Sequence, residues 1–321
     1  MTTKQNTLCR IRLRNKAKEN PGYYDRYLVD RYDLRDLLKH VAEEYASFII
    51  EREEDPSILK RYPDIIFEFL MVLRVLNRYL WRTLEGAAWV YFGPLKIPIP
   101  HYSTIYRRCM NISLDELFYR YKHRSGTNKD GVFKRGAAID SCGLKICGRG
   151  DWLVKKHGVS PRSHWIKLHL VVDVVSHEIL DHSVTLENVS DSSEYCRLIS
   201  SALIGAELVW VYGDGAYDNK RNYEHAKENG YKFVCKPRKN ASTRSRGCPQ
   251  RAQLVHEIKS KGLNSWKRRV KYGNRWSVER SYATFKRIFG DRLQARLWER
   301  ILDEIRFKVQ VYNYFIWIYY H

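Results

Sequence analysis

The first third of the chain shows helical apolar spacing interrupted by polar connections. Residues 33–54 have the pattern of a helix, and Ile65–Leu84 places its apolar side chains on one stripe of a second helix. Glycine and proline pairs between residues 86 and 100 predict a loop. A short helix is expected to follow, with Ser103 as its N-cap and Met110 near its end. This part of the chain is therefore predicted to be entirely helical.

After a polar linker at residues 123–131, the pattern changes to short β-rich runs. Strands are predicted at the following segments: one ending with Ala137–Asp140, then Trp165–Val175, Glu178–Leu186, Leu208–Tyr212 and Lys232–Cys235. Helices are predicted at Asp191–Leu203, Asn219–Asn229, Arg275–Phe289 and from Trp298 to the end. Three strands, a helix, a strand, a helix and a strand indicate a mixed α/β sheet covered by helices.

These patterns divide the chain into a helical region at 1–130 and an α/β domain at 131–321. Residues 4–18 form a basic arm, which could be a solvated tail or could contact nucleic acid. Residues 236–274 are basic and rich in turn-forming residues, so we interpret about 236–274 as a loop or small insertion on a phosphate-facing surface.

The charge of the chain points to a polyanionic partner. Its 321 residues carry 57 Lys and Arg against 36 Asp and Glu, a formal net charge of +21. Nucleic acid is the obvious partner, although a basic protein without such a partner has the same composition. The 44% of hydrophobic residues is enough for a packed core, and the apolar segments are shorter than the ~20 residues of a membrane span. We expect no membrane association.

Location follows from the same features. The first residues are polar and basic, without the apolar stretch of a secretory signal. The seven cysteines are scattered, as is typical of reduced thiols in the cytoplasm, and DNA binding would place the protein at the nucleoid. Cys142 and Cys147 lack a second matching pair, which argues against a zinc site.

Three acidic residues are candidates for metal ligands. Asp140 and Asp214 each follow an apolar run that indicates a strand, and Glu279 lies on a predicted helix. Carboxylate oxygens suit hard divalent cations, and acids from separate elements could together hold a metal pair. Taken alone, Asp140 could be an ordinary turn residue and Asp214 part of a hairpin turn. Asp218 is expected to begin a helix and is left out of the metal site.

Glu279 belongs to the pattern Tyr272-x2-Arg275-x3-Glu279-x6-Lys286. At 3.6 residues per turn these side chains fall on one helical face, where Glu279 could meet metal and the cations phosphate. A surface ion pair between Arg275 and Glu279 is the alternative. A separate apolar stripe would dock this helix on the core through Val278, Tyr282, Phe285 and Phe289. A core position is also expected for Trp276.

This pattern resembles the Tyr-Arg-Glu-Lys signature of a large group of insertion-sequence DDE transposases. AAIDSCG around Asp140 and YGDGAYD around Asp214 look like the two aspartate motifs of the group. The segment from Lys155 to Asp173 is similar to its second strand and basic lead-in, and PIPHYSTIYRR resembles its Pro-x-x-Ser-Thr-x-x-Arg-Arg segment. The likeness runs from about residue 60 to the end. The stretch between Asp214 and Glu279 is too short for the large β-rich insertion of some relatives, so base flipping by such an insertion is not implied.

The resemblance implies a ribonuclease-H-like mixed sheet flanked by helices, preceded by an all-helical DNA-binding region. It implies two Mg2+ ions, replaceable by Mn2+, held by Asp140, Asp214 and Glu279. It also implies double-stranded DNA as the partner, at transposon ends and target, and a homodimer in the DNA complex. Tyr272, Arg275 and Lys286 would position the scissile DNA. Further expected DNA contacts are the basic residues Arg107, Arg108, Lys155, Lys156, Lys267, Arg268 and Arg269.

Three other functions fit parts of the pattern. A nuclease that cuts without transposing would share every catalytic residue, and a non-catalytic DNA-binding protein would share the charge. A hydrolase of small phosphoesters would share the acids, but the charge of +21 argues against it. The terminal repeats, the target site and the excision pathway are not encoded in any pattern of the chain.

Overall fold

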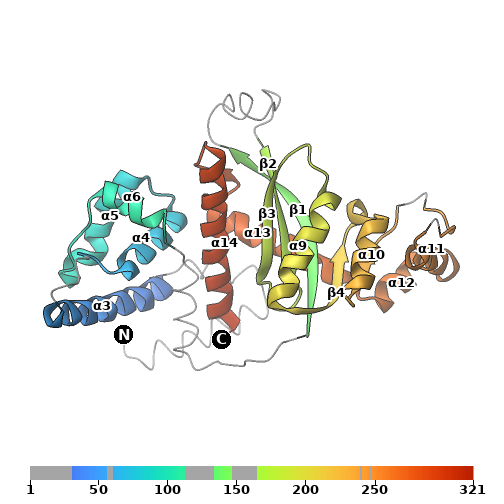
Figure 1. Ribbon diagram of the computed structural model, residues 1–321, viewed down its shortest axis with the longest axis horizontal. Helices are drawn as coiled ribbons and strands as arrows, with labels where there is room; N and C mark the ends of the chain where they lie inside the picture. Colours follow the sequence, from blue (N-terminus) through green and yellow to red (C-terminus); the bar gives the residue numbers. More distant parts are fainter. Residues whose placement is uncertain are drawn as a thin grey trace.

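A computed structural model describes residues 31–55, 61–112, 134–146, 165–238, 241–245 and 247–320. A group of N-terminal helices lies beside a helix-covered sheet, and the long C-terminal helix stands between the two parts (Figure 1). Lys155 and Lys156, the basic arm and the linker at 123–131 lie outside the described residues.

The helices of the N-terminal part are α3 (Arg31–Glu54), α4 (Asp64–Asn77), α5 (Trp81–Phe92), the 3-10 helix η1 (Gly93–Leu95) and α6 (Tyr102–Cys109). The single helix expected at Ile65–Leu84 is wrong. Arg78 adopts a left-handed conformation (φ 54°) at the C-cap of α4, and the extended Leu80 precedes α5. The predicted Ser103 cap is also wrong, because the His101 side chain accepts the backbone N–H of Ser103.

One sheet forms the centre of the α/β part. Within the described ranges it contains six strands: β1 (Lys134–Ile146), β2 (Trp165–Asp173), β3 (Ile179–Leu186), β4 (Glu207–Gly213), β5 (Lys232–Cys235) and β6 (Arg292–Leu293). The order is β3-β2-β1-β4-β5, and β6 pairs with β1. β1 is antiparallel to β2 and parallel to β4 and β6. The predicted mixed α/β architecture and the order of its elements are confirmed.

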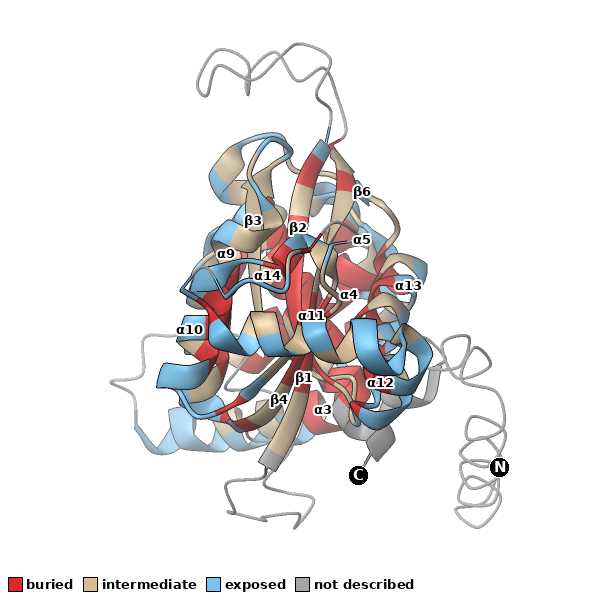
Figure 2. Ribbon diagram, turned by 90° about the vertical axis from the view of Figure 1, so that its right-hand side faces the viewer, coloured by how far each residue is buried: buried red, intermediate tan, exposed pale blue. Residues whose placement is uncertain are grey.

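Helices cover both faces of this sheet. On one face lie α9 (Asp191–Gly205) and α10 (Lys220–Glu228), and on the other α13 (Trp276–Phe289) and α14 (Trp298–Tyr320). The apolar stripe predicted for α13 is buried against the core, as expected for amphipathic helix packing. Buried segments accordingly concentrate along the strands and the inner helix faces in an end-on view (Figure 2).

The loop expected at about 236–274 is largely helical. It contains α11 (Pro249–Lys261), α12 (Leu263–Arg269) and the 3-10 helix η3 (Tyr272–Arg275). Pro249 occupies the first turn of α11, where its missing N–H costs nothing, and Gly262 (φ 83°) lets the chain turn into α12. Both helices lie at the end of the sheet formed by β4 and β5 (Figure 1). Trp266 of α12 is buried.

The hydrophobic core is continuous from the N-terminal helices to the sheet. α4 contacts α13 and α14, and one apolar cluster extends from Leu37 to Ile316. On α14, the buried Glu304 pairs with Lys308 at 2.7 Å and accepts the backbone N–H groups of Gln294 and Ala295. None of the described helices combines the length and apolar character needed to cross a membrane.

Candidate active site

The register of β1 and β4 places two acids side by side. Ala138 pairs with Tyr212 in parallel register, and each acid lies two residues further along the chain, Asp140 within β1 and the extended Asp214 directly after β4. Side chains two residues apart on a strand share a face, and neighbouring strands are about 4.8 Å apart. Asp140 is therefore next to Asp214. The expectation that Asp140 ends its strand is wrong, because β1 continues to Ile146.

Glu279 reaches these acids from α13, which is fastened to the strands by two hydroxyl groups. The Tyr282 hydroxyl lies 2.8 Å from the carbonyl oxygens of both Asp140 and Leu168. Ser277 donates to the carbonyl oxygen of Val174 at 3.2 Å. These contacts hold the first two turns of α13 against β1, β2 and the residue that follows β2.

The three acids line one cavity of about 580 Å³. The other lining residues are Gly215, Lys236, Lys267, Tyr272, Gly273, Arg275 and Trp276. Lys236 was missed by sequence reasoning. Gly213 pairs with Cys235 in parallel register, so Lys236 follows β5 at the same level as Asp214 follows β4. The rule that ligands bind beyond the carboxyl ends of parallel strands would have located this lysine.

Arg275 stands among the carboxylates rather than at the cavity edge. Its Nη1 lies 2.6 Å from Oε1 of Glu279 and 3.7 Å from Oδ2 of Asp140. Only 14% of its side chain is exposed. The predicted ion pair between Arg275 and Glu279 is thus present, but it lies within the site and includes Asp140.

Burial raises the pKa of Asp140 to about 6. The backbone N–H of Ser141, which donates to Oδ1 at 2.8 Å, opposes this rise. The negative charges of Asp214 and Glu279 raise the pKa further, and Arg275 lowers it. A carboxyl group whose charge is disfavoured in this way gains from a cation of higher charge.

The carboxylate oxygens that line the cavity are of the chemical type that binds divalent cations. Carboxylates are hard oxygen ligands, and the guanidinium of Arg275 shows that a cation is accommodated between two of them. Burial raises the pKa of the nearby Tyr217 hydroxyl, and the charges of Asp140 and Asp214 add to that rise.

The three carboxylates of the cavity are not arranged around a common point where a metal ion would bind. Across the described ranges, no set of three His, Cys, Asp or Glu side chains is placed to hold an ion. Asp214 turns Oδ1 toward the backbone N–H of Ala216 at 2.8 Å, and Glu279 and Asp140 are both engaged by Arg275. Arg275 thus occupies carboxylate oxygens of Glu279 and Asp140 that a bound ion would use.

The other two signature residues face the same strands. Tyr272 donates its hydroxyl to the carbonyl oxygen of Gly213 at 3.1 Å, directly before Asp214. Lys286 forms a hydrogen bond with Cys142 on β1. Tyr272 and Arg275 lie in η3, so the signature does not occupy a single helix. All four side chains nevertheless point toward β1 and the end of β4.

The remaining basic candidates are dispersed. Arg107 and Arg268 are exposed, whereas Arg108 pairs with Asp64 and Arg269 with Glu257. Lys267 lines the cavity. The core position expected for Trp276 is wrong, because this residue is 54% exposed and lines the cavity. The guanidinium carbon of Arg275 lies 5.1 Å from the centre of its ring.

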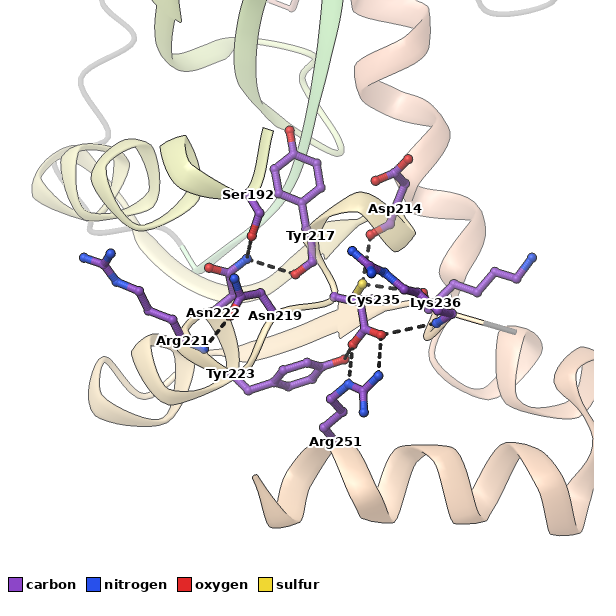
Figure 3. Close-up of polar contacts among 12 residues, drawn as sticks. Ser192, Asp214, Tyr217, Asn219, Arg221, Asn222, Tyr223, Cys235, Lys236 and Arg251 are labelled. Atoms are coloured by element: carbon purple, nitrogen blue, oxygen red, sulfur yellow. Dashed lines mark hydrogen bonds and ion pairs between the residues drawn. The ribbon is translucent and has the colours of Figure 1, made fainter. Parts of the chain in front are cut away.

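Asp218 has a structural role. Its fully buried carboxylate accepts two hydrogen bonds from Arg251, at 2.7 and 2.8 Å, and one from the backbone N–H of Arg238. Figure 3 shows the Asp214 carboxylate on the far side of its backbone from Arg251. Asp218 caps the 3-10 helix η2 (Gly215–Tyr217), and its pair with Arg251 ties α11 to the loop that carries Asp214.

A family model described as "Transposase DDE domain" matches residues 131–314, more than half of the chain. Among solved structures, the chain is similar to the piggyBac transposase of a cryo-EM synaptic complex with hairpin DNA. The identity is 13%, the TM-score is 0.40, and the match covers 92% of this chain and 74% of that chain. On the family match, which includes all three cavity acids, the chain belongs to the DDE transposase family.

Proposed function

We propose that the protein is an active transposase, which cuts DNA at the ends of its element and joins those ends to target DNA. The observation that carries this proposal is the shared cavity of Asp140, Asp214 and Glu279, assembled by the register of two strands and by α13. The sheet order β3-β2-β1-β4-β5 supports a ribonuclease-H-like arrangement.

The three acids are proposed as the ligands of the divalent ions, with Mg2+ as the natural metal and Mn2+ as its substitute. When bound, such ions activate a water and then a terminal 3′-hydroxyl for in-line attack on phosphate. The cations of the chain have a separate task. Lys236 and Lys267 on the cavity wall bind non-bridging phosphate oxygens and fix the DNA strand across the acids.

Tyr272 and Lys286 contact the backbone and side chains next to the acids rather than the acids themselves. The Tyr272 hydroxyl holds the carbonyl group before Asp214, and Lys286 binds β1 two residues from Asp140. Both keep the strands and α13 in the geometry that aligns DNA with the acids. Lys155 and Lys156 remain proposed DNA contacts.

DNA beyond the cavity is proposed to contact the N-terminal helical region, where Arg107 is exposed, and the surface of α12 around Arg268. Joining two element ends requires two active sites, so a homodimer is proposed for the DNA complex. Binding to chromosomal DNA would place the protein at the nucleoid.

A strand-transfer assay tests this function. Purified protein is incubated with Mg2+ or Mn2+, labelled DNA that carries the sequences flanking its gene, and a plasmid target. Asp140→Asn, Asp214→Asn and Glu279→Gln run in parallel, because each keeps the size of the side chain and removes its charge. Joined product with the wild type and none with the three variants supports the proposal.

A nuclease is the second candidate, because it would use the same acids and the same cavity. Metal-dependent cleavage without joined product would favour it. DNA binding with neither reaction under both metals would leave a DNA-binding protein and overturn the catalytic proposal.

A further inference from the structure

Arg275 contacts two of the carboxylates that the proposed function assigns to the divalent ions. Its guanidinium contacts Glu279 on α13 and Asp140 on β1, and we call this contact the Arg275 bridge. A guanidinium stays charged at every physiological pH, so the bridge does not open by losing a proton. With 14% of the side chain exposed, water screens the contact only in part.

A divalent ion and the Arg275 bridge compete for the same oxygens. Oε1 of Glu279 is occupied by Nη1 at 2.6 Å, and a positive charge at that distance repels an ion placed on the carboxylates. No described group of three acidic, histidine or cysteine side chains is positioned for a metal. The protein's own cation thus holds the acids in an arrangement that disfavours metal.

An anion that enters the cavity would offer the guanidinium of Arg275 a position away from Asp140 and Glu279. The other charged side chains on its wall are Asp214 and two lysines, Lys236 and Lys267. The lysines attract a phosphodiester into the cavity, and a guanidinium binds phosphate oxygens through two parallel N–H groups. The ring centre of Trp276, a residue that is 54% exposed, lies 5.1 Å from the guanidinium carbon.

We propose that Arg275 is a positioning residue that makes divalent-cation binding depend on DNA. Without DNA, the Arg275 bridge holds Asp140 and Glu279; a phosphate in the cavity draws the guanidinium away and frees both acids. By linkage, the metal then strengthens DNA binding by the same factor. This inference rests on the proposed metal and DNA site, and it would prevent cleavage chemistry from being assembled away from DNA.

The test is Mn2+ binding to the full chain, measured from the electron paramagnetic resonance signal of free Mn2+. Without DNA, Arg275→Ala and Arg275→Gln should bind Mn2+ about tenfold more tightly than the wild type. Adding a short duplex, corrected for Mn2+ bound by the duplex alone, should tighten binding to the wild type and change the variants far less. Asp140→Asn in each background should abolish the measured binding, which assigns it to the cavity.

Arg280→Ala is the matched control, because Arg280 is exposed on the same helix and does not line the cavity. It removes the same charge and should leave Mn2+ binding at the wild-type level. Circular dichroism checks that each variant is folded, and Arg275→Gln retains a donor for Glu279 if Arg275→Ala unfolds.

Equal Mn2+ affinity in the wild type and the folded Arg275 variants would overturn the inference, as would an equal gain in Arg280→Ala. Its failure is distinguishable from failure of the proposed function. If the wild type carries out strand transfer but binds Mn2+ with the same affinity as the Arg275 variants, the inference is wrong and the proposed function stands. If the Arg275 variants bind Mn2+ more tightly but the wild type neither cuts nor joins DNA, the proposed function is wrong and the inference stands.

Discussion

Asp140 and Asp214 stand at the same level of the sheet, because each lies two residues beyond the paired Ala138 and Tyr212. Their separation is set by backbone hydrogen bonding rather than by a flexible loop. A register shift of one residue would send Asp140 to the opposite face of β1. The pair therefore depends on the correct alignment of β1 with β4.

Asp214→Asn and Asp218→Asn should fail in different ways. The partly exposed carboxylate of Asp214 accepts one hydrogen bond, so its replacement should abolish strand transfer with little change in unfolding free energy. Asp218 is fully buried and neutralises Arg251, so its replacement should cost about 3 kcal/mol. Urea unfolding beside the strand-transfer assay measures both. Equal loss of stability in the two variants would contradict this division.

Asp140 should make stability depend on pH in the absence of metal. Burial raises its folded pKa to about 6 from 3.8, so its contribution is present below pH 3.8 and is lost as pH rises through 6. Between pH 4.5 and 7.5, the wild type should lose about 2 kcal/mol relative to Asp140→Asn. Urea unfolding in chelator at both pH values gives the difference, and parallel pH curves for the two proteins would refute the prediction.

Lys236 and Lys267 should contribute to DNA affinity by neutralising phosphate charge. Replacing either with alanine should reduce the slope of log affinity against log salt by about 0.9. Lys261→Ala, on the exposed end of α11, is the control and should change the slope less. Fluorescence anisotropy with labelled duplex over a salt series measures the slopes. An unchanged slope in both cavity variants would exclude them from phosphate contact.

Lys308→Ala should destabilise the protein strongly. It leaves the Glu304 carboxylate, with only 7% exposure, without its cation, and a broken buried pair costs about 3–5 kcal/mol. Lys39→Ala breaks the exposed pair with Glu43 and should cost under about 0.5 kcal/mol. Both values come from chemical denaturation at neutral pH. Similar small effects in the two variants would show that the backbone N–H groups at Gln294 and Ala295 suffice for Glu304.

Local periodicity was enough to predict most elements and the acids themselves. Apolar spacing predicted the order of the elements along the chain and the buried stripe of α13. The ends of the apolar runs pointed to Asp140 and Asp214, and the spacing from Tyr272 to Lys286 pointed to Glu279. The exposed position of Trp276, which was expected in the core, could also have been predicted from the helical spacing. It is two residues, or about 200° of helical rotation, from the buried Val278.

Tertiary structure decided what local pattern did not. Directly after Ile139 the β1 sequence has four small or polar residues, 140–143, and the strand continues through them by pairing with β2. The break at Arg78 uses a left-handed non-glycine residue without a local signal. The position of Arg275 among the carboxylates follows from the packing of α13 on β1, which spacing along one helix does not specify.

The continuous apolar cluster from the N-terminal helices to α14 has a consequence for how the molecule comes apart. Separating the two regions would expose the side of α14 that contacts α4. We therefore expect one cooperative melting transition for both. DNA bound by the N-terminal helices would then keep a fixed orientation toward the carboxylates, because the two regions would not rotate independently of each other.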